Sequence, residues 1–265
     1  MSCVESYLQA YLYYKEYNVP LLYCGSFIKA ESVLMDREKF ENFQGFERLQ
    51  NILLSNGMMQ YRVHFDDEVY DLTLAETSQE YRRGMKNSPW RSDHYVWLKK
   101  DGNESEYFDC YPVYRASLQQ KNKNELFSGK RISYFLINFD ESALIKAGVK
   151  QLEAMAESYS RNIAIQSIDD AVNALLILKV SRERMCLWLE EFGKKTPFDL
   201  SRLKELCAEQ YRDIAKLLVV CQRCRLRKQH EITSEISTAM ARICKADEII
   251  AKEAKKRRRE HAKYI

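Results

Sequence analysis

Residues that favour turns and strands are concentrated before residue 147, and the chain after that point is patterned for helices almost throughout. Six of the eight glycines, fourteen of the seventeen tyrosines and two of the three tryptophans lie in residues 1–146. Short strands need turn residues at close intervals, whereas long helices exclude them from their interiors. The sequence therefore predicts an α+β protein, with a mixed domain over residues 1–142 and an all-helical domain over residues 143–265.

In the first part, apolar spacing predicts helices over 36–56 and 73–84 and strands over 58–71 and 132–139. In the second part it predicts helices over 144–159, 167–179 and 182–192, one from Thr196 to about residue 228, and one from residue 232 to the end. The last two have the lengths of an antiparallel pair, so we expect a helical bundle.

Composition and charge indicate the cellular compartment of the protein. No stretch approaches the about 18 apolar residues of a membrane span, and the N-terminus lacks the pattern of a secretory signal. Eight cysteines without the spacing of a small disulfide framework fit a reducing compartment. We expect a cytoplasmic protein without a membrane partner. Residues 1–146 carry a net charge of −3, and residues 147–265 carry +7.

Cys3 directly precedes a run with helical spacing. Val4, Tyr7, Leu8 and Tyr11 recur on one helical face. The thiol is therefore expected at the first turn of a buried helix, where free backbone N–H groups and the helix dipole favour a thiolate. Cys3 is the candidate nucleophile.

A second stretch supplies a base and an acid. The pair Asp101-Gly102 separates two β-rich segments and predicts a hairpin. The hairpin places His94 at the start of one strand and Asp109 near the end of the other, where residues across a pair lie within about 5.5 Å. Asp93, the rival acid, should point to the opposite face. His64, beside Asp66 and Asp67, is interpreted as a solvated strand end and as the alternative base.

Cys3, His94 and Asp109 provide what nucleophilic thiol catalysis needs: a thiolate, an imidazole that moves its proton, and a carboxylate that orients the imidazole. An oxyanion hole would use the Cys3 backbone N–H and one side-chain donor. Papain-like proteases take that donor from a glutamine ahead of the cysteine. Only Met1 and Ser2 precede Cys3 in this sequence, so the donor is not assigned.

These motifs resemble a known family. Cys3-Val4-Glu5-Ser6 is similar to the C-E-S start of the papain-like domain in the butirosin-biosynthesis acyltransferase family, with one residue inserted. His94-Tyr95-Val96 and Asp109-Cys110-Tyr111-Pro112 resemble the H-x-V … D-x-x-P hairpin that this family shares with bacteriocin-processing cysteine peptidases. The resemblance covers roughly residues 1–115. The chain departs from the family after the first helix, where a glycine-rich loop is reduced to Gly25, and before His94, where no apolar strand is found.

The resemblance implies a papain-like fold followed by a helical part, and an acyl or aminoacyl transfer in the biosynthesis of a specialised metabolite. The acyl group would pass from a carrier-protein phosphopantetheine thioester, through a Cys3 thioester, to an amine. The implied partners are an acidic acyl or peptidyl carrier protein and a small amine acceptor. The resemblance implies that the protein itself binds no cofactor or metal. Two alternatives stay open: a cysteine peptidase or amidase with the same triad, and a non-catalytic helical interaction protein with a degenerate papain-like part.

Two further features lie in the helical part. Cys207, Cys221 and Cys224 fall near one stripe of a helix and are interpreted as core residues rather than zinc ligands. The basic end, residues 252–263, lacks interleaved aromatic residues, so we expect an acidic protein partner rather than nucleic acid. Arg257 and Arg258 are the expected contacts.

Overall fold

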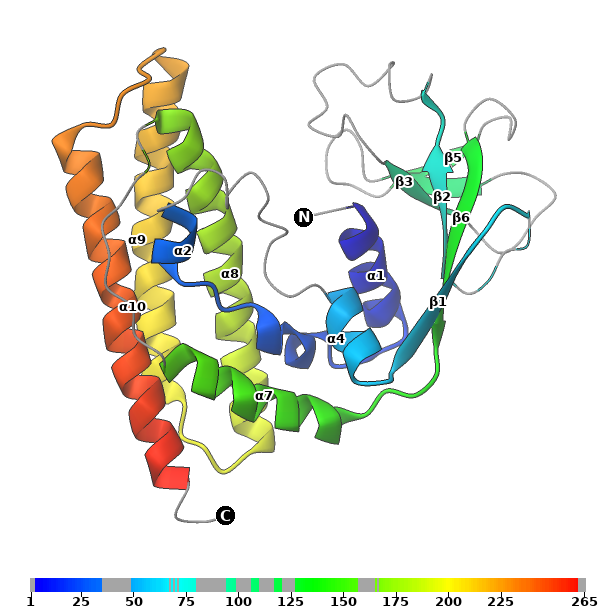
Figure 1. Cartoon of the computed structure of the whole chain (residues 1–265), viewed down its shortest axis with the longest axis horizontal. Helices are drawn as coiled ribbons and strands as arrows, with labels where there is room; N and C mark the ends of the chain where they lie inside the picture. The colour runs from blue at the N-terminus through cyan, green and yellow to red at the C-terminus, as the bar shows by residue number, and fades with distance from the viewer. Residues whose placement is uncertain are drawn as a thin grey trace. The chain divides into compact units, whose positions relative to one another are not determined.

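The structure is a computed structural model of the chain (Figure 1). It describes residues 3–34, 49–66, 68, 70, 72–79, 94–98, 106–109, 117–120, 127–156, 165 and 167–261. The fold is α+β, as expected from the sequence, and the chain divides into two compact units. One comprises Met1–Val19 and Leu49–Asp140, and the other comprises Pro20–Arg48 and Glu141–Ile265. Residues 20–34, which the sequence predicts to lie in the first domain, thus belong with the C-terminal helices.

The first unit is built on a six-stranded antiparallel sheet with the strand order β1-β6-β2-β3-β4-β5. The strands are β1 (Met59–His64), β2 (Leu72–Thr77), β3 (Tyr95–Leu98), β4 (Glu106–Asp109), β5 (Ser117–Gln120) and β6 (Phe127–Leu136). The pairing of β3 with β4 is the hairpin that the sequence predicts. Strand β6 lies between β1 and β2, so this side of the sheet depends on residues far apart in the chain.

Strand β2 corrects one expectation. The sequence analysis predicted a helix over 73–84, but residues 72–77 form a strand paired with β6 and β3. Leu72 and Leu74 are buried on one face of this strand, and Thr73 and Ala75 are buried on the other. A strand buried on both faces has no alternation of polar and apolar residues, which explains why the pattern misled the prediction. The remainder of the predicted helix, from residue 80, lies outside the described residues.

Helices α1 (Cys3–Tyr14) and α4 (Leu49–Ser55) cover one face of this sheet. Tyr7 and Tyr11 of α1 both meet the ring of Trp97 on β3 edge to face, with centroids 6.4 and 6.3 Å apart. The hydroxyl of Tyr134 on β6 donates to Oε1 of Gln50 on α4 at 3.4 Å. The pairing registers place Trp97 and Tyr134 on the same face, since Trp97 is opposite Leu74 and Tyr134 is opposite Leu72.

The second unit is helical (Figure 1). Its elements are η1 (Val19–Gly25, a 3-10 helix whose first residue belongs to the other unit), α2 (Ala30–Leu34), α7 (Glu141–Ala156), α8 (Ile168–Lys195), α9 (Ser201–Leu226) and α10 (Ser234–His261). The Ser167 side chain caps α8 by accepting from the Asp170 N–H at 3.1 Å. The sequence analysis predicted two helices, over 167–179 and 182–192, and the structure joins them into one. None of the described helices is long and apolar enough to cross a bilayer.

Arg182 lies in α8 next to the position where the sequence predicts a break between two helices. Its side chain is fully buried and donates to three other segments. One nitrogen donates to the Asp247 carboxylate of α10 at 2.7 Å, one to the Ile28 carbonyl at 2.7 Å, and Nε to the side-chain oxygen of Gln210 on α9. Its guanidinium also lies 4.5 Å from the centre of the Phe27 ring. A buried charge needs such partners, so this arginine fixes how α8, α9, α10 and residues 27–28 pack.

The buried ion pair gives a prediction about stability. Asp247→Ala should lower the free energy of unfolding by about 3–5 kcal/mol, because it leaves the buried Arg182 charge without its carboxylate. Urea unfolding followed by circular dichroism would measure the change. Replacing both partners, Arg182→Met with Asp247→Leu, should recover part of the loss, since no unpaired charge is then buried. A single variant no less stable than the double variant would contradict this account.

Candidate functional site

Cys3 is the first residue of α1, so its backbone lies where the sequence predicts, at the N-terminal turn of a buried helix. Its side chain lies outside the described residues. The helix is held against the sheet by the Tyr7 and Tyr11 contacts with Trp97. The Glu5 carboxylate, in the first turn of α1, accepts the Leu49 N–H at the start of α4 at 3.4 Å. The start of α1 is therefore tied to both the sheet and a second helix.

His94 and Asp109 meet. The distance between His94 Nε2 and Asp109 Oδ1 is 3.0 Å, and the two residues are 0% and 1% exposed. Trp97 pairs with Phe108, so Asp109 lies opposite Val96. His94 is two residues from Val96 and thus diagonal to Asp109 on the same face, which is within reach of an imidazole. The hairpin thus brings together the two residues that the sequence analysis paired. Asp93, the rival acid, lies outside the described residues.

This contact decides how a neutral His94 would hold its proton. A carboxylate can only accept hydrogen bonds, so the His94 nitrogen facing Asp109, Nε2, carries the hydrogen. The lone pair of the neutral ring is then on Nδ1. Nδ1 is accordingly the atom that could take a proton from a thiol, while Asp109 keeps the ring in that tautomer.

The strand register limits the path by which a thiol on α1 could reach His94. Successive side chains of a strand point to opposite faces, so Trp97 lies on the face covered by α1, and Asp109 and Val96 lie on the other. His94 precedes the first residue of β3, and its carbonyl still accepts the Thr77 N–H at 2.8 Å. A thiol carried by α1 would therefore have to reach His94 past this end of β3.

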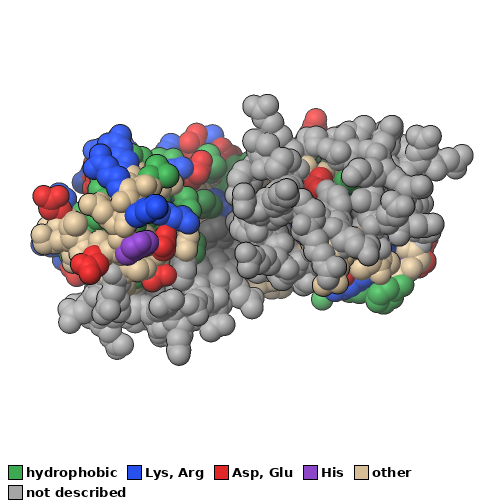
Figure 2. Space-filling view, turned by 90° about the horizontal axis from the view of Figure 1, so that it is seen from above, with side chains coloured by type: hydrophobic (Ala, Val, Ile, Leu, Met, Phe, Trp, Pro, Cys, Tyr) green, Lys and Arg blue, Asp and Glu red, His purple; other side chains and the backbone are tan. Residues whose placement is uncertain are grey.

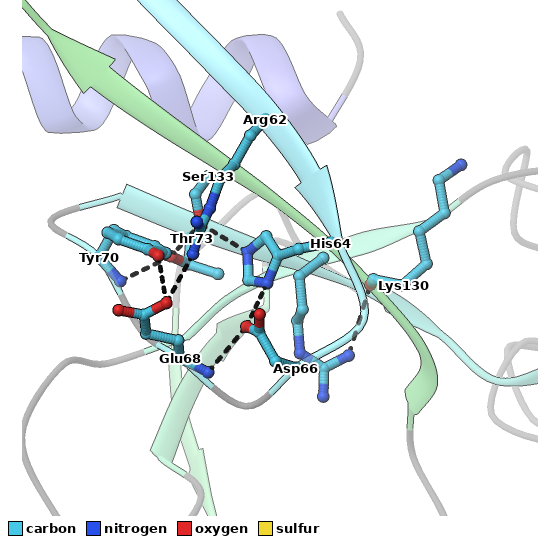
Figure 3. Close-up of polar contacts among 9 residues, drawn as sticks. Arg62, His64, Asp66, Glu68, Tyr70, Thr73, Lys130 and Ser133 are labelled. Atoms are coloured by element: carbon cyan, nitrogen blue, oxygen red, sulfur yellow. Dashed lines mark hydrogen bonds and ion pairs between the residues drawn. The ribbon is translucent and has the colours of Figure 1, made fainter.

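His64 ends β1, as the sequence predicts, but the prediction that it is solvated is wrong. Its exposure is 8%, and both ring nitrogens are engaged (Figure 3). Nδ1 lies 2.6 Å from Asp66 Oδ1, and Nε2 lies 2.8 Å from Ser133 Oγ on β6. Ser133 is also 2.8 Å from the hydroxyl of Thr73 on β2. The imidazole, the hydroxyls and the carboxylate thus join β1, β6 and β2. Sequence spacing does not reveal this group, because Ser133 is distant from His64 in the chain.

The direction of these hydrogen bonds follows from the acceptors. The Asp66 carboxylate accepts from His64 Nδ1–H and from the Glu68 N–H at 3.1 Å. Nε2 of the neutral ring is then an acceptor, so the Ser133 hydroxyl donates to it and receives the hydrogen of Thr73. This is the donor order of a serine triad, but Ser133 is fully buried within the central strand. We assign the group to holding the sheet together rather than to catalysis.

The environment of Asp66 lowers the pKa of its carboxyl. Partial desolvation raises the pKa, but the hydrogen bonds from His64 and the Glu68 N–H, with the charges of His64 and Arg62, outweigh it and hold the pKa below the ordinary 3.8. A carboxyl with a depressed pKa stabilises the fold above its unfolded pKa, and this contribution is lost as the pH falls through the folded value.

Asp66→Asn should therefore destabilise the β1–β6–β2 region near neutral pH, and the difference from wild type should shrink below pH 3.8. Amide hydrogen exchange of the three strands at several pH values would measure it. Glu68→Gln is the matched control, because Glu68 carries a similar charge on the same segment but does not contact His64. A difference that stays constant down to the lowest pH would contradict the assignment.

Three cysteines of the helical unit are poor nucleophiles. Burial raises the pKa of Cys207 to about 12 and that of Cys221 to about 11, and it also raises the pKa of Cys186. Cys221 and the half-buried Cys224 pack in the core of the bundle, as expected. Within the described part of the chain, no group of three or more His, Cys, Asp or Glu side chains is placed to hold a metal ion.

Comparison of the chain with protein-family models, with curated proteins and with solved structures finds no match.

Proposed function

We propose that the protein is a cysteine-dependent acyltransferase with a papain-like first unit, in which Cys3 is the nucleophile, His94 the base and acid, and Asp109 the orienting residue. The observation that carries the proposal is the buried contact of 3.0 Å between His94 Nε2 and Asp109 Oδ1. It is supported by α1, which begins at Cys3 and packs on the sheet that carries this pair.

In the first half of the reaction, His94 Nδ1 takes the thiol proton of Cys3, and the sulfur attacks the carbonyl carbon of a thioester. The bond to the leaving thiolate breaks, and His94 returns the proton to that thiolate. Asp109 accepts the Nε2–H throughout and stabilises the imidazolium that forms. The N-terminal end of α1 favours the thiolate form of Cys3.

In the second half, an amine attacks the acyl carbon of the Cys3 thioester. The amine proton passes to His94 Nδ1 as the carbon–sulfur bond breaks, and the Cys3 thiolate regains a proton from the same ring. The donor is an acyl or aminoacyl group on the phosphopantetheine of an acidic carrier protein, and the acceptor is a small amine of a specialised biosynthetic pathway. The phosphopantetheine is part of the substrate. Free thiols suit a reducing compartment, so we place this activity in the cytoplasm.

The same three residues support hydrolysis if water replaces the amine, which gives a cysteine peptidase or amidase. A non-catalytic interaction protein is favoured by one specific observation, the strand register, which puts the α1 face and the His94–Asp109 face on opposite sides of the sheet. These alternatives predict different fates for the Cys3 thiol.

Incubation with acyl-carrier thioesters should give an acyl adduct on Cys3, visible by intact mass and absent in Cys3→Ala. His94→Ala should slow acylation about 10²- to 10⁴-fold, because proton transfer then has no positioned base. Asp109→Asn keeps the size of the side chain and should also slow the reaction. Discharge of the adduct by amines supports transfer, and discharge by water alone supports hydrolysis.

Cys186 provides the internal comparison, because burial raises the pKa of its thiol. Cys186→Ala should leave the adduct unchanged. Alkylation should be faster at Cys3 than at Cys186, and the advantage should fall in His94→Ala. If no adduct forms and both thiols react at the same rate, the catalytic proposal is wrong and the interaction protein is favoured.

A further inference from the structure

The last turns of α10 carry an exposed row of cations, which we call the basic stripe: Lys252, Lys255, Lys256 and Arg259. Their spacing of three and four residues places all four side chains on one face of the helix. They line a surface hollow of about 380 Å³, together with Glu260. The stripe spans about 10 Å along the helix axis.

The neighbouring arginines are neutralised within the unit. Arg257 contacts the carboxylates of Glu253 at 2.7 Å, Glu260 at 3.3 Å and Asp199 at 3.4 Å. Arg258 contacts Glu153 of α7 at 3.0 Å. These two arginines, the expected partner contacts, are thus each paired with carboxylates of the same unit. Glu260 is engaged by Arg257, so it is shared with a cation outside the stripe.

The four cations of the basic stripe form no ion pair with a residue that the structure describes. Like charges at these spacings destabilise a helix. The helix dipole offsets this repulsion only in the last turn, which includes Arg259 but not Lys252 or Lys255. Lys256 is partly balanced by Asp199, whose pKa is lowered by hydrogen bonds from Ser201 and by the charges of Arg257 and Lys256. The rest of the stripe's positive charge faces solvent.

The other end of α10 differs. Figure 2 looks onto that end of the helical unit, where Lys and Arg side chains lie among Asp and Glu side chains. There Arg225 is paired with Asp169 at 2.9 Å. An excess of positive charge around a hollow, four cations against the one carboxylate of Glu260, is thus a property of the basic stripe and not of every basic segment in the unit.

We propose that the basic stripe binds the acidic surface of a partner protein. Three of its four cations are lysines, which pair with carboxylates as compact point charges on flexible stems. The stripe has no aromatic side chain on which a nucleic-acid base could stack. A helix with Glu or Asp at the same spacing of three and four residues presents a matching row of carboxylates. The proposal does not depend on acyl transfer, although an acidic carrier protein would satisfy it.

The test uses the full chain and a labelled helical peptide with glutamates at positions i, i+3, i+4 and i+7. Fluorescence anisotropy would measure binding at low and high salt. The stripe variant replaces the four cations with glutamate: Lys252→Glu, Lys255→Glu, Lys256→Glu and Arg259→Glu. It should lower the affinity at least about tenfold, and salt should weaken wild-type binding because exposed charges are screened.

The matched control reverses four other exposed cations and changes the net charge equally: Arg212→Glu, Lys216→Glu, Arg242→Glu and Lys245→Glu. It should retain wild-type affinity. A neutral version of the stripe, with glutamine at the same four positions, should also lose binding and introduces no new repulsion. Circular dichroism would verify that each variant is folded.

Three results would each overturn the proposal. The first is that the wild-type chain fails to bind the peptide, and the second is that the control loses as much affinity as the stripe variant. The third is that duplex DNA or phosphatidylglycerol vesicles bind the stripe more tightly than the peptide does. Because the assay involves neither Cys3 nor a thioester, it can fail while the acylation experiment succeeds, and the reverse is also true.

Discussion

The alternation of side chains along paired antiparallel strands is the constraint on which the first unit depends. Once β6 pairs with both β1 and β2, each residue is committed to one face of the sheet. The registers place His64, Ser133, Asp109 and His94 on one face, and Trp97 on the face that α1 and α4 cover. The positions of the two histidines are thus fixed by the same strand pairing that forms the apolar core.

Burial gives these polar groups their geometry. A polar side chain removed from water needs hydrogen-bond partners, and a carboxylate next to an imidazole fixes which ring nitrogen carries the hydrogen. His94 with Asp109 and His64 with Asp66 both meet this requirement. The second ring nitrogen of His64, however, is already hydrogen-bonded to the buried Ser133 hydroxyl. Of the two pairs, the proposed chemistry uses His94 with Asp109. The same register that forms this pair sets the path by which the Cys3 thiol would have to approach.

In the helical unit, the hydrogen-bond and ion-pair partners of the cations decide their roles in the same way. Arg182 is buried and tied to a carboxylate, an amide and a carbonyl, so it specifies packing. Arg257 and Arg258 are tied to carboxylates at the surface. The basic stripe presents its charge outward around a hollow. Residues of similar chemistry therefore have three different roles according to the carboxylates that the fold brings near them.

The sequence by itself determined what depends on neighbouring residues: the α+β class, the helix beginning at Cys3, and the hairpin that joins His94 to Asp109. Each is encoded within one turn, one helix or one hairpin, where periodicity and turn residues are informative.

Only the tertiary structure decided features that depend on distant partners. These are the strand at 72–77, the burial of His64 by Ser133, the continuous α8 around Arg182, and the transfer of residues 20–34 to the helical unit. The papain-like arrangement of Cys3 is still a prediction, because the side chain of Cys3 lies outside the described residues. The physical reason for the division is that a non-local contact depends on which remote residue arrives beside it, and the pattern of a single segment does not specify that residue.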